Sequence, residues 1–241
     1  MNKKLSGALV ILMLATMACG LPSIPGISPV TSGGGSSNTS GGSTQPQATA
    51  APQTQSNVLF KDDFSDSNSG WDHSSTQNGT TDYEQGGYRI HVVTANYEKW
   101  ANPNKTFPDD VRIEVDAAKI GGPDANDFGV ICRYQDRDNY YDMIITSDGY
   151  AAIVKYESGN SSVISASDGK LQPVDGINSG STPNHIRADC VGSNLTLYAN
   201  GTRVAQATDS SFTGGDVGLN AGTYDTGGTD ILFTNFFVYA P

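Results

Sequence analysis

The sequence lacks the features that several large classes of protein require. Its 14 Lys and Arg residues are outnumbered by 25 Asp and Glu residues, the formal charge is -11, and no basic run follows residue 4. Nucleic-acid phosphates are bound by clustered Lys and Arg, so we predict that the protein does not bind nucleic acid. No apolar run reaches the roughly 20 residues that a membrane-spanning helix needs. The sequence therefore does not describe a polytopic membrane protein.

Residues 1–19 have the pattern of an export signal. Lys3 and Lys4 precede the short apolar run LSGALVILMLATMA, which ends directly before Cys19. This run is too short for a permanent membrane span. Ala18 before Cys19 resembles the lipobox of bacterial lipoproteins, although the two residues before Ala18 differ from the usual ones. The resemblance implies cleavage at Cys19, acylation of its sulfur and a lipid-anchored, extracytoplasmic location. The alternative is an ordinary secretory signal with an incidental cysteine.

Residues 20–57 contain no charged and no aromatic residue and consist mainly of Gly, Ser, Thr, Pro, Gln, Asn and Ala. Such a segment cannot bury enough apolar surface to offset the entropy of ordering it, so we predict a disordered linker. As a flexible coil it would reach roughly 35 Å. All the acidic residues lie in residues 58–241, which we expect to form one domain large enough for a substantial core. The linker would hold this domain near the membrane, which it would contact only through the lipid.

Residues 58–241 alternate repeatedly between apolar and polar side chains. A period of two places successive side chains on opposite faces of a strand, and no stretch shows a comparable helical period. The clearest alternations, each expected to share one face, are Tyr88, Ile90 and Val92; Ile113, Val115 and Ala117; and Phe128, Val130, Cys132 and Tyr134. Further strands are predicted at residues 140–146, 150–156, 185–191, 194–199, 203–208, 217–221 and 231–239.

The dipeptides between these strands are typical of hairpin turns. Asp148-Gly149, Gly192-Ser193 and Asn200-Gly201 each separate two predicted strands. Asp-Gly and Asn-Gly readily adopt the positive φ angles of turns that match the twist of antiparallel strands. About a dozen strands joined by such turns, without crossover helices, predict an all-β fold, a two-sheet antiparallel sandwich of jelly-roll type.

Several of these segments resemble a known superfamily. The segments NLTLYANGTRV (residues 194–204) and DVGLNAG (residues 216–222) look like the late strands of concanavalin A-like lectin/glucanase domains, which include laminin G-like modules. DFGVICRYQDRDNYY (residues 127–141) and ILFTNFFVY (residues 231–239) are similar to secreted bacterial domains of the 3-keto-disaccharide hydrolase-like type. The resemblance implies the fold over most of residues 58–241. It implies no particular activity, because this superfamily includes lectins, glycosidases and protein-binding modules.

Two cysteines remain once Cys19 is assigned to the lipid. Cys132 and Cys190 each lie within a predicted strand, and each shares a face with apolar neighbours. In a secreted domain, two remaining cysteines are most simply interpreted as one disulfide. The alternative is a pair of buried free thiols, which would follow if their strands lie far apart.

We find no complete catalytic motif in the sequence. The run beginning at Glu114 resembles the ExDxxE signature of family 16 glycoside hydrolases through Glu114 and Asp116, but Lys119 occupies the position of the acid/base glutamate. A lysine ammonium does not readily replace a carboxylic acid there, so we interpret both acids as polar residues on a solvated strand face. There is no GxSxG motif.

The three histidines offer no metal-binding spacing. His73, His91 and His185 are distant in sequence and form no HxxxH pattern. A catalytic triad assembled by the fold is the alternative to three structural or surface histidines. We therefore name no catalytic residue.

Clusters of Asp and Asn raise the alternative of a structural calcium ion. Ca²⁺ prefers hard oxygen ligands in loops, and Asp62 and Asp63 form the favoured pair because the first strand usually lies beside the last in this fold. None of the clusters fits an EF-hand. The competing explanation is that Asp and Asn form turns well.

Aromatic residues offer candidates for a sugar-binding surface. Aromatic rings stack on sugar C–H faces, and amide and carboxylate groups bind hydroxyls. The candidates are Trp100, Tyr97, Tyr140, Tyr141 and Asn139. The alternative is that these aromatics fill the core, which is the role predicted for Trp71.

The favoured function is a surface-anchored, non-catalytic module that binds glycan or another extracellular polymer. A saccharide hydrolase and a laminin G-like protein-binding module are the alternatives. A glycosidase needs two convergent carboxylates, and the sequence pattern supplies no second one, which favours binding.

Overall fold

Strands account for the regular structure of the computed structural model, which describes residues 57–84 and 86–241. Residues 53–241 separate from the rest of the chain as one compact unit. The predicted signal peptide with Cys19, and the predicted linker apart from Asn57, lie outside the described residues. The described part contains no helix, so none in this part could cross a membrane. The prediction of an all-β domain is confirmed.

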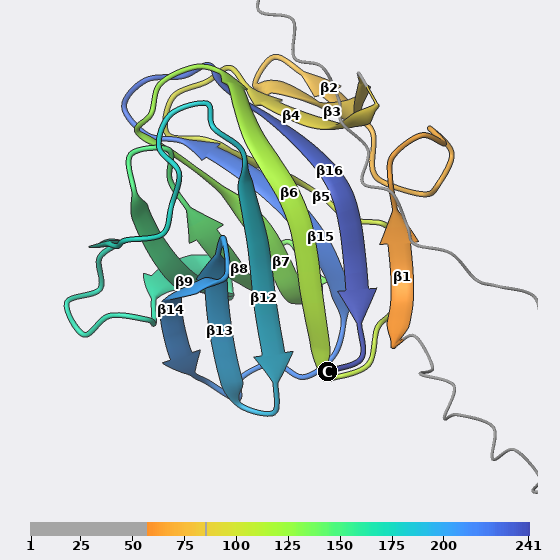
Figure 1. Ribbon diagram of the computed structural model, residues 1–241, viewed down its shortest axis with the longest axis vertical. Helices are drawn as coiled ribbons and strands as arrows, with labels where there is room; N and C mark the ends of the chain where they lie inside the picture. The colour runs from red at the N-terminus through yellow and green to blue at the C-terminus, as the bar shows by residue number, and fades with distance from the viewer. Residues whose placement is uncertain (1–56, 85) are drawn as a thin grey trace, which may run out of the picture. The chain divides into compact units, whose positions relative to one another are not determined.

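Two antiparallel sheets pack face to face. The first has the order β14-β13-β12-β6-β16-β4-β3-β2, with β1 also paired to β16. The described strands of this nine-stranded sheet are β1 (Val58–Asp62), β2 (Ser74–Thr76), β3 (Gly79–Glu84), β4 (Gly87–Val92), β6 (Val111–Gly121), β12 (Asn184–Val191), β13 (Asn194–Ala199), β14 (Thr202–Thr208) and β16 (Thr229–Tyr239). In Figure 1, β12, β6 and β16 cross in front of the second sheet.

The second sheet has the order β10-β9-β8-β7-β15-β5, with β11 also paired to β9. The described strands of this seven-stranded sheet are β5 (Glu98–Ala101), β7 (Asn126–Asp136), β8 (Asn139–Ile145), β9 (Tyr150–Glu157), β10 (Asn160–Val163), β11 (Gln172–Pro173) and β15 (Asp216–Thr223). The predicted hairpins are present, because β8 pairs with β9, β12 with β13 and β13 with β14. At the β13–β14 turn, Asn200 and Gly201 have φ values of 50° and 81°.

One large apolar core lies between the sheets. It collects the inward side chains of both, including Ile113 and Phe233 from the first sheet and Val130 and Met143 from the second. Trp71 is 2% exposed and packs edge-on against Phe236 within this core. Its predicted role in core packing is confirmed.

The predicted disulfide joins the two sheets across this core. Cys132 lies on β7 and Cys190 on β12, their sulfurs are bonded, and both residues are fully buried. The bond closes a loop with a sequence separation of 58 residues. The alternative of two free thiols is therefore wrong.

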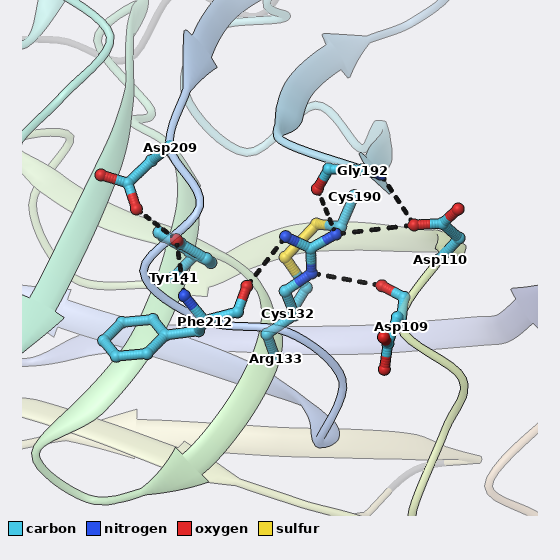
Figure 2. The surroundings of a disulfide bond; sticks show 9 residues. All are labelled: Asp109, Asp110, Cys132, Arg133, Tyr141, Cys190, Gly192, Asp209 and Phe212. Atoms are coloured by element: carbon cyan, nitrogen blue, oxygen red, sulfur yellow. Dashed lines mark hydrogen bonds and ion pairs between the residues drawn. A yellow bond between two sulfur atoms is a disulfide. The ribbon is translucent and has the colours of Figure 1, made fainter.

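A buried arginine lies beside the disulfide (Figure 2). Arg133 is 3% exposed, and its guanidinium donates hydrogen bonds of 3.2, 3.0 and 2.7 Å to the carbonyl oxygens of Asp109, Phe212 and Gly192. Asp110 lies 3.7 Å from the same guanidinium and balances its charge. The five donors of one guanidinium thus hold three loops at this end of the sandwich.

Arg133 also reverses the expected direction of the next side chain. The alternation of the sequence predicts that Tyr134 shares the inner face with Cys132, but the Tyr134 ring lies 5.7 Å from that of Tyr140, which faces outward. Arg133 adopts a φ of 54°, and β7 has one extra residue against β15 between the pairs Ile131–Gly218 and Tyr134–Asp216. Such a bulge inserts one residue and moves the following side chains to the opposite face.

Candidate functional site

The outer face of the seven-stranded sheet, which points away from the core, carries an unusual concentration of polar groups. Tyr141, Met143 and Ile145 face the core, so the intervening residues Tyr140 and Asp142 face outward. The same alternation turns three outward groups toward one another from strands β5, β7 and β15: Glu98, Asp127 and Asn220.

Three carboxylates and one amide form the centre of this face. Asn220 Nδ2 donates a 3.0 Å hydrogen bond to Asp142 Oδ2 and a longer one, 3.4 Å, to Glu98 Oε1. The Tyr156 hydroxyl donates to the other oxygen of Glu98 at 2.7 Å. Asp142 and Asn220 are 2% and 0% exposed, and Asp127 is 8% exposed. This acidic cluster, Glu98, Asp127 and Asp142, is thus almost covered by neighbouring side chains.

Two buried oxygen atoms in this centre lack hydrogen-bond partners. Asp142 Oδ1 and Asn220 Oδ1 have none within the described part of the chain. Leaving a buried polar atom unpaired costs about 1–3 kcal/mol. Unpaired buried acceptors in native proteins often mark a place where a ligand supplies the donor.

Burial and mutual repulsion raise the pKa values of the acidic cluster. Desolvation, and then the charge of Glu98, raise the pKa of Asp127 to about 7, and an interaction with Tyr224 offsets part of this shift. The same two causes, in the same order, raise the pKa of Asp142 well above its usual value. An acid that stays protonated near neutral pH beside a second carboxyl group can donate a hydrogen bond or a proton to a ligand.

Aromatic rings line the cluster on one side. Tyr140 stacks on Tyr156 with ring centroids 4.5 Å apart and planes inclined by 13°. Trp100 and Tyr134 flank Tyr140 at 6.2 and 5.7 Å. Aromatic faces of this kind bind the C–H surfaces of sugar rings.

A hollow of about 280 Å³ opens beside the acidic cluster. Glu98, Asp127 and Asp142 form one wall. Ile144, Val154, Val163 and Leu171 form the apolar part of the lining, in which Val154 is the cross-strand neighbour of Asp142. Tyr156, Tyr224, Ser161 and Ser162 add hydroxyl groups. This volume is at the lower end of the range for ligand pockets, roughly 300–1,000 Å³, and suits one ring-sized group.

Two glycines keep the centre of the face open. A side chain at Gly222 would place its Cβ 2.5 Å from Asp127 Oδ1, and one at Gly129 would place it 2.0 Å from the carbonyl oxygen of Met143. Neither position can carry a larger residue without displacing the carboxylate or the backbone.

The residues predicted for a sugar-binding surface fall in different places. Trp100 and Tyr140 lie on the outer face beside the acidic cluster. Tyr97 is 40% exposed and lines an adjoining hollow with Glu98 and Asp127. Tyr141 lies in the core, where its hydroxyl contacts Asp209 and accepts a hydrogen bond from the amide of Phe212 (Figure 2).

Asn139 lies at the start of β8 and holds two turns. Its amide nitrogen donates to Asp136 Oδ1 at 2.9 Å, and its amide oxygen accepts from the backbone of Ser158 at 3.0 Å. These partners already occupy the donor and acceptor that a sugar hydroxyl would use.

The sequence did not single out the acidic cluster. Glu98, Asp142 and Tyr156 are not among the candidates, and Asp127 belongs only to one of the Asp and Asn clusters that raise the calcium alternative. Alternation carries part of the signal, since Asp142 stands between core residues on one strand. Which strands become neighbours was not readable from any one segment.

The Asp62 and Asp63 carboxylates are already engaged by protein donors. Asp62 accepts hydrogen bonds from the indole of Trp71 at 3.0 Å and the amide of Phe64 at 2.7 Å, and it contacts the Ser69 hydroxyl. Asp63 is exposed and accepts from Ser65. No group of three or more acidic, His or Cys ligands placed to hold a metal ion occurs within residues 57–84 and 86–241.

The ExDxxE-like run lies on the other sheet. Glu114 and Asp116 are on β6, on the face of the nine-stranded sheet that points to solvent, where Asp116 pairs with His185 at 2.8 Å and with Asn235 at 2.8 Å. These acids are therefore remote from the acidic cluster in the fold.

No protein-family model matches the sequence, and no curated protein does. Solved structures do. The chain is similar to the carbohydrate-binding module CBM66 from Bacillus subtilis, with 21% identity over 70% of this chain and 95% of that one and a TM-score of 0.56. It is similar to a β-glucanase from Bacillus licheniformis, with 14% identity over 76% and 97% of the two chains and a TM-score of 0.53.

A protein of unknown function with a galectin-like fold, also from Bacillus subtilis, is a further neighbour, with 12% identity over 76% and 96% of the two chains and a TM-score of 0.52. At these identities the likeness establishes the fold. The predicted two-sheet antiparallel sandwich of jelly-roll type is confirmed.

Proposed function

We propose that the protein is a glycan-binding module whose site is the outer face of the seven-stranded sheet. The observation that carries the proposal is that the acidic cluster and Tyr156 line one hollow, while Tyr140 stacks on Tyr156 and Trp100 lines an adjoining hollow that shares Glu98. Carboxylates accept hydrogen bonds from sugar hydroxyls while the rings cover the C–H faces. Neighbours described as a carbohydrate-binding module and a β-glucanase support this ligand class.

We further propose that Cys19 carries a lipid that anchors the module outside the cytoplasm. The charged start, the short apolar run and the position of Cys19 support this, as does the disulfide, which forms in oxidising compartments. Palmitate should label the full chain in a bacterial host and fail to label the Cys19→Ser variant. Labelling that survives the substitution would contradict the anchor.

Saccharide hydrolysis is a second candidate, favoured by the pairing of Glu98 with Asp142. A glycosidase needs one protonated and one ionised carboxyl group, and the raised pKa of Asp142 beside Glu98 fits that division. Asp142 would act as the acid and Glu98 as the base or nucleophile. Release of reducing sugar that disappears in both Glu98→Gln and Asp142→Asn would replace the binding function by this one.

A glycan array tests the binding function directly. Residues 53–241 form a compact unit with its own core, so this segment can be used in soluble form. We expect binding to a subset of glycans, and a loss of at least tenfold in affinity for Trp100→Ala without a change in melting temperature. The control is Tyr150→Ala, at an exposed aromatic at the start of β9. A blank array with and without added Ca²⁺ would contradict the proposal, and binding abolished by a chelator would support the calcium alternative.

A further inference from the structure

We propose that the hollow beside the acidic cluster binds a glycan residue that carries a free, protonated amino group. This inference rests on the proposed function, because it assigns a ligand chemistry to the same face. It concerns the charge of the ligand, which the glycan-binding proposal leaves open.

The charged side chains that line the hollow are all acidic. Glu98, Asp127 and Asp142 line it, and no Lys, Arg or His is among its described lining residues. Lys99 lines an adjoining hollow, but its Nζ turns to the Ser74 hydroxyl at 3.1 Å. Lys170 stands between the lining residues Gly169 and Leu171, and its side chain is exposed. Three carboxyl groups in a nearly dry site, without a cation, repel one another strongly.

One acceptor of the acidic cluster lacks a donor. Asp142 lines the hollow, its Oδ1 is buried and has no partner in the described part of the chain, and Asn220 Oδ1 has none either. The Asn220 amide and the Tyr156 hydroxyl are already used, and the hydroxyl groups of Ser161, Ser162 and Tyr224, which also line the hollow, do not pair with Asp142 Oδ1. An ammonium group brings three donors and a positive charge, whereas a hydroxyl brings one donor and no charge.

Without a ligand, bound protons neutralise the carboxylates of the acidic cluster. Asp127 and Asp142 hold protons up to an unusually high pH because their charged forms are buried beside Glu98. A ligand ammonium would replace those protons as the compensating charge. The binding energy would come from charge-assisted hydrogen bonds, which are roughly twice as strong as neutral ones.

A bare metal ion fits the hollow less well than an ammonium group. The described residues contain no group of three acidic, His or Cys ligands placed around one ion position. The apolar part of the lining, Ile144, Val154, Val163 and Leu171, offers an ion no ligand. A sugar ring with an amino group presents charge to the acids and C–H groups to these side chains.

The test compares three oligosaccharides of equal length by isothermal titration calorimetry on residues 53–241: β-1,4-linked glucosamine, its fully N-acetylated form and the corresponding glucose oligomer. We expect the glucosamine oligomer to bind at least tenfold more tightly than either neutral one. Equal or weaker binding of glucosamine would overturn the inference. If a neutral oligomer then binds, the glycan-binding function survives without it. If none of the three binds, the inference fails, and the array alone decides the wider function.

Variants separate the hollow from general attraction to an acidic protein. Asp142→Asn and Asp127→Asn should each remove the preference for glucosamine. Both variants should fold, because each replaces a protonated carboxyl group by a neutral amide of similar shape. Glu157→Gln removes an exposed charge at the end of the same strand as Tyr156 and should keep the preference. If Asp142→Asn still prefers glucosamine to the neutral oligomers, the assignment of the amino group to this hollow is wrong. Ca²⁺ that binds parent but not Asp142→Asn, and that displaces glucosamine, would identify a metal site instead.

Discussion

The Tyr156 hydroxyl and the Glu98 carboxylate meet at 2.7 Å although three strands separate β9 from β5 in their sheet. Adjacent strands lie about 4.8 Å apart, so the backbones of β9 and β5 would be about 19 Å apart in a flat sheet. The two side chains can meet only because the sheet is curved, with its outer face concave. The curvature brings together acids and rings from strands that are not neighbours.

Removal of the Tyr156 hydroxyl tests this contact. We expect Tyr156→Phe to lower the free energy of unfolding by about 1 kcal/mol, because Glu98 loses a donor in a partly buried site. Tyr150→Phe, at an exposed ring, should change it by no more than a few tenths of a kcal/mol. Urea unfolding of both variants beside the parent measures the difference. Equal stability of the two variants would show that the bond contributes nothing.

The disulfide between Cys132 and Cys190 should contribute strongly to stability. Closing a loop of this length removes entropy from the unfolded chain worth about 4 kcal/mol, less any strain. The double variant Cys132→Ala/Cys190→Ala should therefore unfold at a lower urea concentration by a corresponding amount. The reduced parent is the second measurement. A loss below about 1 kcal/mol would contradict the entropic estimate.

The guanidinium of Arg133 should be irreplaceable by an ammonium. One Nζ cannot reach the carbonyl oxygens of Asp109, Phe212 and Gly192 together, so Arg133→Lys leaves buried acceptors unpaired. We expect a loss of about 2–4 kcal/mol in the free energy of unfolding. Arg137→Lys, at an exposed side chain four residues along, is the control and should be neutral. Equal stability of Arg133→Lys and Arg137→Lys would contradict the role of Arg133 in holding the three loops together.

The stability of the free protein should fall as the pH rises from about 4 to 7. Burial raises the pKa of Asp127 from 3.8 to about 7, so in this window the folded state binds a proton that the unfolded chain has lost. By linkage, the loss of this proton lowers the free energy of unfolding between pH 4.5 and 7.5. The raised pKa values of Asp142 and Asp216 act in the same direction.

Asp127→Asn measures that effect. Urea unfolding at pH 4.5 and 7.5 should show a smaller decrease for this variant than for the parent, because Asn does not titrate. Glu157→Gln, at an exposed carboxylate, should keep the parent's pH dependence. A variant and parent with identical pH profiles would show that Asp127 titrates normally.

Local sequence patterns predict most of the fold. Alternation predicted ten of the described strands and turn dipeptides predicted three hairpins, because both depend on neighbouring residues. Strands β1, β2, β3, β5, β10 and β11 were not predicted. The pairing of Cys132 with Cys190 followed from their number and inward direction. The direction of Tyr134 did not follow, because the bulge at Arg133 is stabilised by carbonyl groups from three distant loops.

By itself, the sequence determined an all-β sandwich, three of its hairpins and its disulfide, and it named Trp100 and Tyr140, which lie on the same face as the acidic cluster. Only the tertiary structure decided the site, because the order and curvature of the strands place Glu98, Asp127 and Asp142 together from three strands. Strand order depends on pairing between residues far apart in the chain. Alternation along a single strand contains no information about that pairing, so the acidic cluster is a property of the folded sheet.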